Sequence, residues 1–384
     1  MPTHETLTIE KLVYGGEGLA RQEGKVVLIP FVAPGEVVRA EVDRVKNDVF
    51  RGRLLEVLSP AAARVEAPCP FFLRCGGCHL QHLDYRTQVE QKTAMLREVL
   101  RRVGKLDISG EIGSITSEAW HYRNRVQLHI DRGAVGYFEH GSRRLCPIDR
   151  CPISSPALNQ AIAALNVRLP QLGSFSGAVE LFTNETEVQV NVLDRAPRSI
   201  FAAIESIGTS APIHYQGFRV SRSSFFQINR FLIDRLVDCA VGEAQGTSAL
   251  DLYAGVGLFS KALAARFGQV TAVEAGHSAF RDLTHNLGAT ARAENATVED
   301  YLGTVQAPPS LVLADPPRAG LTKAVVLQLI RIEAPRLVLV SCDPATLARD
   351  LHGLVASGYQ IEKLTLVDLF PQTFHLETVV HLRR

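Results

Sequence analysis

Short apolar runs alternate with amphipathic segments through the C-terminal part of the chain. The runs predict buried strands at residues 249–252, 270–273, 311–314 and 337–340. Between them, apolar positions recur with helical spacing, notably over residues 258–266 and 322–332. Strands that alternate with helices in this way form parallel βαβ units. The pattern therefore predicts an α/β fold in which residues 223–384 form a doubly wound, Rossmann-like domain.

The N-terminal part of the chain has shorter elements separated by glycine and proline. Strand-like runs at residues 7–9, 25–29 and 37–42 predict a small OB-like β-barrel over residues 1–62. Residues 63–222 combine strand-like runs, such as 126–130, with helical segments, such as 86–103. We therefore expect a mixed α+β central domain between the barrel and the C-terminal domain.

Length and composition limit the class of protein. A chain of 384 residues is long enough for two or three domains. Its apolar runs all fall short of the roughly 18 residues that span a membrane, and its first residues lack the apolar region of a signal peptide. We expect a cytoplasmic protein that does not contact a membrane.

Arginine and aromatic side chains are interleaved over residues 120–150. A net charge of +1 gives no general attraction to a polyanion, so this local grouping carries more weight. Guanidinium groups for phosphates, beside rings that stack on bases, suit single-stranded or looped RNA. A solvated hairpin face would explain the same charges. The residues concerned are Tyr122, Arg123, Arg125, Arg132, Tyr137, Phe138, Arg143, Arg144 and Arg150.

Three of the seven cysteines lie close together in the chain. Cys69, Cys75 and Cys78 are joined by short segments that include two adjacent glycines. Such spacing lets one loop wrap a metal centre, and the glycines let backbone amides approach sulfur. Cys146 or Cys151, each followed by a proline, could supply a fourth ligand. A 4Fe–4S cluster and a structural zinc ion are both compatible with four thiolates, and the spacing favours iron.

Another cysteine, Cys342, lies at the carboxyl end of the predicted strand at residues 337–340 and precedes a proline-containing turn. Open α/β sheets place their chemistry at this end of their strands. A buried structural thiol is the ordinary alternative for a single cysteine. The neighbouring motifs favour a nucleophile instead.

A glycine-rich turn follows the predicted strand at residues 249–252. Tyr253, Gly255 and Gly257 lie between this strand and the next helix, where a ligand can approach the backbone. Glu274 ends the following strand, and a carboxylate there can accept hydrogen bonds from both ribose hydroxyls. The combination suits S-adenosylmethionine as well as NAD. Because a candidate nucleophile is present and no hydride acceptor is evident, we favour the methyl donor.

Three more polar residues belong to candidate motifs. Asp315 ends the predicted strand at residues 311–314 and can orient a base or contact the cofactor, although an ordinary turn residue would also fit. Gln227 offers an amide before the first helix of the domain. Glu377 lies just before the last strand, where an isolated glutamate is usually solvated.

Together these motifs resemble those of the RNA 5-methyluridine methyltransferases, which use S-adenosylmethionine and act on ribosomal RNA or the tRNA T-loop. The resemblance covers almost the whole chain. Residues 5–60 look like the TRAM domain of this family, an OB-like RNA-binding module. Residues 76–82 (GGCHLQH), 341–350 (SCDPATLARD) and 375–377 (HLE) resemble its cluster, nucleophile and general-base motifs.

The resemblance implies a role for each motif residue. It implies that Cys342 and Glu377 are catalytic. It implies that the cofactor contacts Gln227, Tyr253, Gly255, Glu274 and Asp315. It also implies a 4Fe–4S cluster on Cys69, Cys75, Cys78 and Cys151, and so favours iron over zinc and Cys151 over Cys146. The chain departs from the family at Leu258 and Asp343, where relatives commonly carry asparagine.

The implied reaction begins with attack of the Cys342 thiolate on uracil C6, which makes C5 nucleophilic. Methyl transfer would follow, and then removal of the C5 proton by Glu377 and loss of the thiol by β-elimination. The target uridine must be unstacked, and Phe225 and Phe226 could receive it.

The partners implied by the resemblance are RNA and S-adenosylmethionine. The barrel and the cluster favour large-subunit ribosomal RNA, and the tRNA T-loop uridine is the alternative. We expect a monomer without an obligate protein partner. The alternative of another class is a catalytically inactive iron–sulfur RNA-binding protein, whereas the cysteine spacing argues against a radical enzyme.

Overall fold

The computed structural model describes residues 3–46, 49–172 and 175–384, which form two compact units. The first unit comprises Met1–Glu98, Tyr137–Ile148 and Phe370–His375. The second comprises Val99–Gly136, Asp149–Leu369 and Leu376–Arg384. The division into three domains at residues 62 and 222 remains a prediction.

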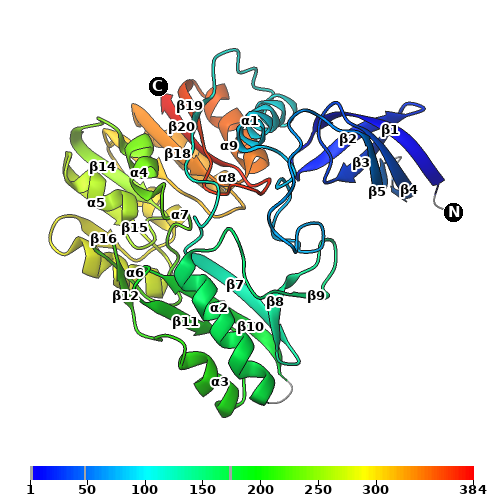
Figure 1. Ribbon diagram of the computed structural model, residues 1–384. Coiled ribbons are helices and arrows are strands. Elements are labelled where there is room, and N and C mark those ends of the chain that lie inside the picture. The colour runs from blue at the N-terminus through cyan, green and yellow to red at the C-terminus, as the bar shows by residue number, and fades with distance from the viewer. Residues whose placement is uncertain (1–2, 47–48, 173–174) are drawn as a thin grey trace. The chain divides into compact units, whose positions relative to one another are not determined.

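The first unit contains the expected β-barrel, which confirms the OB-like module. Its strands close in the order β1-β2-β3-β5-β4 (Figure 1). Buried apolar side chains fill the interior, among them Leu7, Ile9, Val27, Ile29 and Val38. The strands are β1 (Thr3–Leu12), β2 (Glu17–Gln22), β3 (Lys25–Pro30), β4 (Val37–Lys46) and β5 (Val49–Ser59).

A segment from near the C-terminus also belongs to the first unit. It contacts α1 (Tyr85–Arg102), which confirms the helix expected over residues 86–103. The Gln372 N–H donates to Gln88 Oε1, and Gln88 Nε2 donates to Gln372 Oε1, both at 2.9 Å. Lys92 Nζ donates to the Phe370 carbonyl at 2.9 Å. These buried bonds explain why residues 370–375 belong to the first unit, although the residues before and after them in the sequence belong to the second.

The smaller sheet of the second unit is antiparallel and forms the mixed α+β region. Its strands follow the order β11-β10-β7-β8, and β8 leads on to β9 (Leu145–Pro147) in the first unit. Ser155 caps the longest helix of this region, because its side chain accepts from the Leu158 N–H. The elements are β7 (Arg125–Asp131), β8 (Ala134–Phe138), α2 (Pro156–Arg168), η1 (Leu169–Leu172), β10 (Ser176–Thr183), β11 (Val188–Val192), α3 (Arg198–Glu205), β12 (Ile213–Tyr215) and β13 (Phe218–Val220).

The larger sheet of the second unit has eight strands in the order β16-β15-β14-β17-β18-β20-β19-β6 (Figure 1). The first five are parallel, as expected. They are β16 (Arg292–Glu294), β15 (Phe267–Val273), β14 (Gly246–Leu252), β17 (Leu311–Ala314) and β18 (Arg336–Ser341). The helix before these strands is α4 (Ile233–Val241). The helices between and after them are α5 (Leu258–Ala264), α6 (His277–Leu287), α7 (Val298–Thr304), α8 (Lys323–Ile332) and α9 (Pro344–Ala356).

Two features of this sheet differ from a purely parallel arrangement. β20 (Glu377–Arg383) lies between β18 and β19 (Gln360–Val367) and is antiparallel to both. β6 (Gly113–Ile115) comes from far earlier in the chain and pairs with β19 at the edge. The strand order reverses direction between β14 and β17, which creates the crevice where open α/β sheets bind ligands.

Candidate active site

Five predicted site residues meet at one edge of the larger sheet. Tyr253 follows β14, Glu274 follows β15, Asp315 follows β17 and Cys342 follows β18. Each lies at the carboxyl end of a parallel strand. Glu377 joins them because β20 runs in the opposite direction and therefore begins at this edge.

The register of β18 and β20 brings the two predicted catalytic residues together. Ser341 pairs with Thr378, so Cys342 and Glu377 are the next residues on opposite strands. Burial, followed by the charges of Glu377 and Asp315, raises the pKa of the Cys342 thiol to about 11. The Arg318 guanidinium acts in the opposite direction and lowers that pKa. At neutral pH the resting site therefore contains a protonated thiol.

The acidic residues of the site also have raised pKa values. Glu377 is 5% exposed, and burial together with the charge of Asp315 holds its pKa well above the usual value. Burial and the charge of Asp251 raise the pKa of Asp315 to about 7. With a pKa of about 7, the Asp315 carboxyl can hold and release a proton near neutral pH, as a proton-transfer group must.

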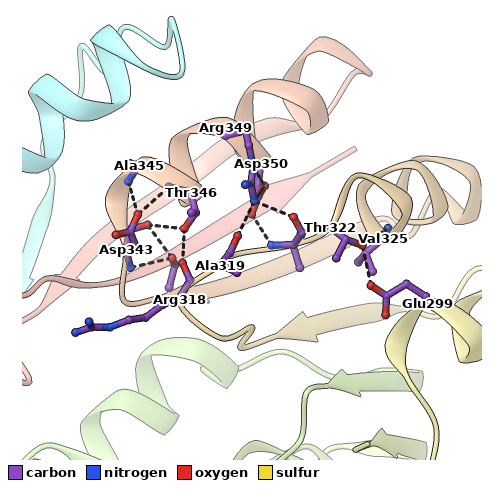
Figure 2. Close-up of polar contacts among 12 residues, drawn as sticks. Glu299, Arg318, Ala319, Thr322, Val325, Asp343, Ala345, Thr346, Arg349 and Asp350 are labelled. Atoms are coloured by element: carbon purple, nitrogen blue, oxygen red, sulfur yellow. Dashed lines mark hydrogen bonds and ion pairs between the residues drawn. The ribbon is translucent and has the colours of Figure 1, made fainter.

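The turn after Cys342 is fixed by a helix cap. Asp343 Oδ1 accepts from the N–H groups of Ala345 and Thr346, at 3.0 and 2.9 Å (Figure 2). Pro344 occupies the first turn of α9, where its missing N–H costs no hydrogen bond. Asparagine and aspartate cap helices about equally well, so the departure at Asp343 preserves this local structure.

The glycine-rich turn fits a nucleoside cofactor. Gly255 has φ +57°, and a Cβ placed there would meet nothing within 4 Å, so the space above the backbone is open. A Cβ at Gly257, where φ is +95°, would lie 2.9 Å from Leu283 Cδ1. The first glycine therefore leaves room for a ligand, and the second lets α5 pack closely on α6.

Glu274 reaches this turn from the neighbouring strand. Its Oε2 accepts from the Gly255 N–H at 2.9 Å and its Oε1 from the Gly276 N–H at 2.6 Å. The carboxylate is thus held beside the open space at Gly255, where an acid that accepts ribose hydroxyls belongs. Leu258, the first residue of α5, is buried, so the chain offers an apolar side chain directly after this turn.

The aromatic pair before the first helix is divided between core and surface. Phe226 is 2% exposed and packs against Phe182, Tyr215 and Phe218, whereas Phe225 is 57% exposed. The expectation that both rings receive a base is therefore wrong for Phe226, whose ring belongs to the core. Gln227 is buried beside it, with its carbonyl accepting from Asn124 Nδ2 at 3.0 Å.

The predicted cluster ligands are shared between the two units. Cys69, Cys75 and Cys78 lie in the first unit, and Cys151 lies in the second. The Gly77 N–H donates to Cys75 Sγ at 3.4 Å, as expected of a glycine loop around a thiolate. Among the residues that the structure describes, no group of three or more His, Cys, Asp or Glu side chains is arranged to hold a metal ion. Cys146, the other candidate, is fully buried in β9.

Several members of the arginine-rich segment have structural roles. Tyr122 is fully buried. Arg125 is buried, pairs with Glu180 at 2.9 Å and stacks over the Phe182 ring. The expectation of an RNA contact is therefore wrong for Tyr122 and Arg125, because neither side chain reaches the surface. Phe138 is 37% exposed, and Arg132 is exposed too.

Sequence reasoning assigned no role to Arg318, although it directly follows the Asp315-Pro316-Pro317 motif. Its charge acts on the Cys342 thiol, as described above. The Arg318 carbonyl also accepts from Thr346 Oγ1 at 3.2 Å (Figure 2). The sequence could have indicated this role, because the basic residue Arg318 follows the candidate site residue Asp315 by three positions.

Two family models match parts of the chain. A family model described as tRNA (Uracil-5-)-methyltransferase matches residues 302–384, and the TRAM domain model matches residues 4–55. Among the described residues, none of the helices has the length and apolar character needed to cross a membrane.

Similar proteins align over nearly the full chain. The 23S rRNA (uracil(1939)-C(5))-methyltransferase RlmD of Halomonas elongata is 31% identical and aligns over 98% of this chain and 89% of its own. The RlmD of Vibrio campbellii is also 31% identical, over 98% and 95%. The solved structure of the Pyrococcus abyssi tRNA (uracil-54, C5)-methyltransferase, in complex with S-adenosyl-L-homocysteine, is 25% identical. It covers 98% of this chain and 99% of its own with a TM-score of 0.77. The chain therefore belongs to the family of RNA uracil-5-methyltransferases.

Proposed function

We propose that the protein methylates C5 of a uridine in structured RNA through a covalent bond between Cys342 and uracil C6. The observation that carries this proposal is the antiparallel register that brings Cys342 and Glu377 together. The open turn at Gly255 and the carboxylate of Glu274 lie at the same edge of the sheet, which supports a nucleoside methyl donor there.

Cys342 is the nucleophile. As its sulfur bonds to C6, the C5–C6 π electrons move to O4 and form an enolate that is nucleophilic at C5. The thiol proton must leave at this step, because the Cys342 pKa is about 11. Asp315, with a pKa of about 7, is a neighbouring group that can accept this proton.

Glu377 is the base for the second half of the reaction. S-Adenosylmethionine, when bound, supplies the methyl group that C5 takes up. Glu377 then removes the C5 proton, the electron pair of that C–H bond restores the C5–C6 double bond, and the sulfur leaves as thiolate. A buried carboxylate with a raised pKa is a stronger base than one in water once it is ionised, which suits this step.

The favoured substrate is large-subunit ribosomal RNA. This rests on the RlmD relatives, which are 31% identical and named for uracil 1939 of 23S rRNA. The tRNA T-loop uridine is the second candidate, because the structural neighbour named for uracil 54 aligns along the whole chain. We also propose that the enzyme acts as a monomer in the cytoplasm.

The proposed function is tested by methyl transfer. Purified protein is offered S-adenosylmethionine with unmodified ribosomal RNA and, in parallel, unmodified tRNA, and nucleosides are analysed by mass spectrometry. We expect 5-methyluridine from ribosomal RNA. Product from tRNA alone would select the second candidate. Absence of product from both, with S-adenosylmethionine still bound, would favour an inactive RNA-binding protein.

The covalent step has a separate test. RNA with 5-fluorouridine at the target position should trap the enzyme, because Glu377 cannot remove fluorine as a proton and the Cys342–C6 bond then persists. The expected result is a protein–RNA complex that survives denaturing electrophoresis and is absent from the Cys342→Ala variant. A complex of equal yield in that variant would overturn the role of Cys342.

We propose in addition that Cys69, Cys75, Cys78 and Cys151 hold a 4Fe–4S cluster with a structural role. The amide–sulfur contact at Cys75 supports a thiolate-binding loop. Protein purified without oxygen should contain iron and absorb in the visible range. Cys151→Ala should lose this absorbance and Cys146→Ala should keep it, and the reverse result would assign the fourth ligand to Cys146.

A further inference from the structure

The loop that leaves β17 is fastened to α9, the helix that begins after the nucleophile. Arg349 Nη2 donates to the Ala319 carbonyl at 2.9 Å (Figure 2) and to the Leu321 carbonyl at 2.8 Å. Asp350 Oδ2 accepts from the Leu321 N–H at 2.8 Å. One short stretch of loop backbone is therefore bound at three points by two adjacent residues of one helix.

Arg349 and Asp350 also bind each other. Arg349 Nε and Nη2 lie 2.9 and 2.8 Å from Asp350 Oδ1, which forms a two-point contact. Asp350 is 4% exposed, and burial raises the pKa of its carboxyl, while the Leu321 amide and Arg349 oppose that rise. A buried carboxylate needs such partners, so removing either one leaves the other poorly satisfied.

Gly320 allows the loop to lie directly on this pair. Its φ is +71°, and a Cβ placed there would lie 2.6 Å from Asp350 Oδ2 and 2.8 Å from Arg349 Nη2. The Gly320 N–H donates to the Pro317 carbonyl at 2.8 Å, which closes a turn within the loop. The absence of a side chain at residue 320 is therefore part of the contact.

The fastened loop carries a group that acts on the nucleophile. Arg318 is one residue before the clamped stretch. Thr346 Oγ1 donates to the Arg318 carbonyl and lies at hydrogen-bond distance from the Asp343 carbonyl, both at 3.2 Å, so Arg318 lies against the turn that directly follows Cys342 (Figure 2). In agreement with this placement, the Arg318 charge lowers the pKa of the Cys342 thiol. Asp315 is held separately, because its N–H donates to the Leu252 carbonyl of the neighbouring strand at 3.3 Å. Release of the loop would consequently displace Arg318 more than Asp315.

We propose that Arg349 and Asp350 are positioning residues, which hold the loop of residues 318–321 on α9 and thereby keep Arg318 against the turn that follows Cys342. The inference rests on the proposed function only for the catalytic role of Cys342. The contacts themselves involve neither RNA nor cofactor, so they can be tested on the protein alone.

The test measures the reactivity of the Cys342 thiol. Full-length protein is alkylated with iodoacetamide from pH 7 to 10.5, and the Cys342 peptide is quantified by mass spectrometry. Arg318→Gln is the reference variant, because it removes the charge that lowers the thiol pKa, and its shift of the alkylation profile is compared with those of the other variants. We expect Arg349→Gln and Asp350→Asn to shift the alkylation profile in the same direction, with alkylation at pH 8.5 about three-fold slower than in wild type.

Two further variants separate geometry from charge. Arg349→Lys keeps the charge but has one donor nitrogen instead of two, so it cannot bind Asp350 through Nε while another nitrogen binds the loop carbonyls. It should therefore behave like Arg349→Gln. Arg331→Gln is the matched control: this exposed arginine in the last turn of α8 also donates to two backbone carbonyls, those of Leu302 and Val305. It should leave the Cys342 profile unchanged.

The outcomes separate this inference from the proposed function. A shift in Arg318→Gln without a shift in Arg349→Gln and Asp350→Asn would overturn the positioning role, and so would the absence of a shift in all three. A wild-type alkylation profile in Arg349→Lys would show that only the charge of residue 349 matters, and this result would also overturn the positioning role. If the profiles shift as expected while the wild type methylates no RNA, the proposed function fails and the positioning role stands.

Discussion

Glu377, the first residue of β20, lies across from Cys342, the residue that follows β18, because the pairing of Ser341 with Thr378 is antiparallel. In an all-parallel sheet the first residue of a strand would be at the opposite edge from the nucleophile. The single reversed strand thus unites a thiol and a carboxylate that are far apart in the sequence.

The first prediction concerns the order of steps at this pair. Glu377→Gln should reduce multiple-turnover formation of 5-methyluridine by about 10²–10⁴-fold, because proton removal, and with it release of the product, loses its base. Addition of the thiol and methyl transfer precede that step, so a covalent protein–RNA complex should accumulate on unmodified RNA. Denaturing electrophoresis measures the complex. Glu362→Gln, on the neighbouring strand β19, is the control and should turn over normally.

The second prediction concerns the pH dependence of the nucleophile. The charge of Asp315 raises the pKa of Cys342, so Asp315→Asn should lower it. Alkylation of Cys342 would then reach its midpoint at a lower pH than in wild type. Site-resolved mass spectrometry across pH 7 to 10.5 checks this shift. Asp234→Asn, on the exposed side of α4, should not change the profile, and an upward shift in Asp315→Asn would contradict the assignment.

The third prediction concerns the acid at the cofactor turn. Hydrogen bonds to a charged group are worth about 1.5–3 kcal/mol, so Glu274→Gln should weaken S-adenosylmethionine binding by about 10- to 100-fold. Isothermal titration calorimetry measures the change. Glu294→Gln alters the acid at the end of the adjacent strand β16 and should bind normally. Equal affinity of wild type and Glu274→Gln would remove this residue from the cofactor site.

The fourth prediction separates two glycines of the same turn. Alanine at positive φ costs about 1–2 kcal/mol at either position. Gly257→Ala should lose more stability than that, because its Cβ would lie 2.9 Å from Leu283 Cδ1. Gly255→Ala meets no protein atom within 4 Å and should mainly lose cofactor affinity. Urea unfolding and cofactor titration of both variants check the contrast, which a larger stability loss in Gly255→Ala would refute.

The fifth prediction concerns stability and pH. Burial raises the pKa of Asp251 to about 7, above its usual value, even though Ser260 donates a hydrogen bond to the carboxylate. A raised folded-state pKa means that the contribution of Asp251 is greatest at acidic pH and is lost as pH rises to 7. Between pH 5 and 7 the wild type should therefore lose up to about 3 kcal/mol relative to Asp251→Asn. Urea unfolding midpoints at pH 5 and 8 measure this, and parallel behaviour of both proteins would exclude it.

Local patterns in the sequence were sufficient to predict much of the fold. Apolar runs at residues 311–314 and 337–340 correspond to β17 and β18, because a strand buried on both faces has no polar positions. The barrel was equally predictable, since turns rich in glycine and proline separate its short strands. Candidate chemistry followed from the same patterns, because Cys342 and Asp315 come directly after such runs.

Only the tertiary structure decided which elements are neighbours. The direction of β20, the addition of β6 to the sheet edge and the departure of residues 370–375 to the first unit all depend on pairing between distant residues. The same holds for Phe226, buried where Phe225 is exposed, and for the contact of Arg349 and Asp350 with the loop after β17. Periodicity reports whether a side chain is buried, but the identity of its partner is set by the packing of the whole unit, which a local pattern does not contain.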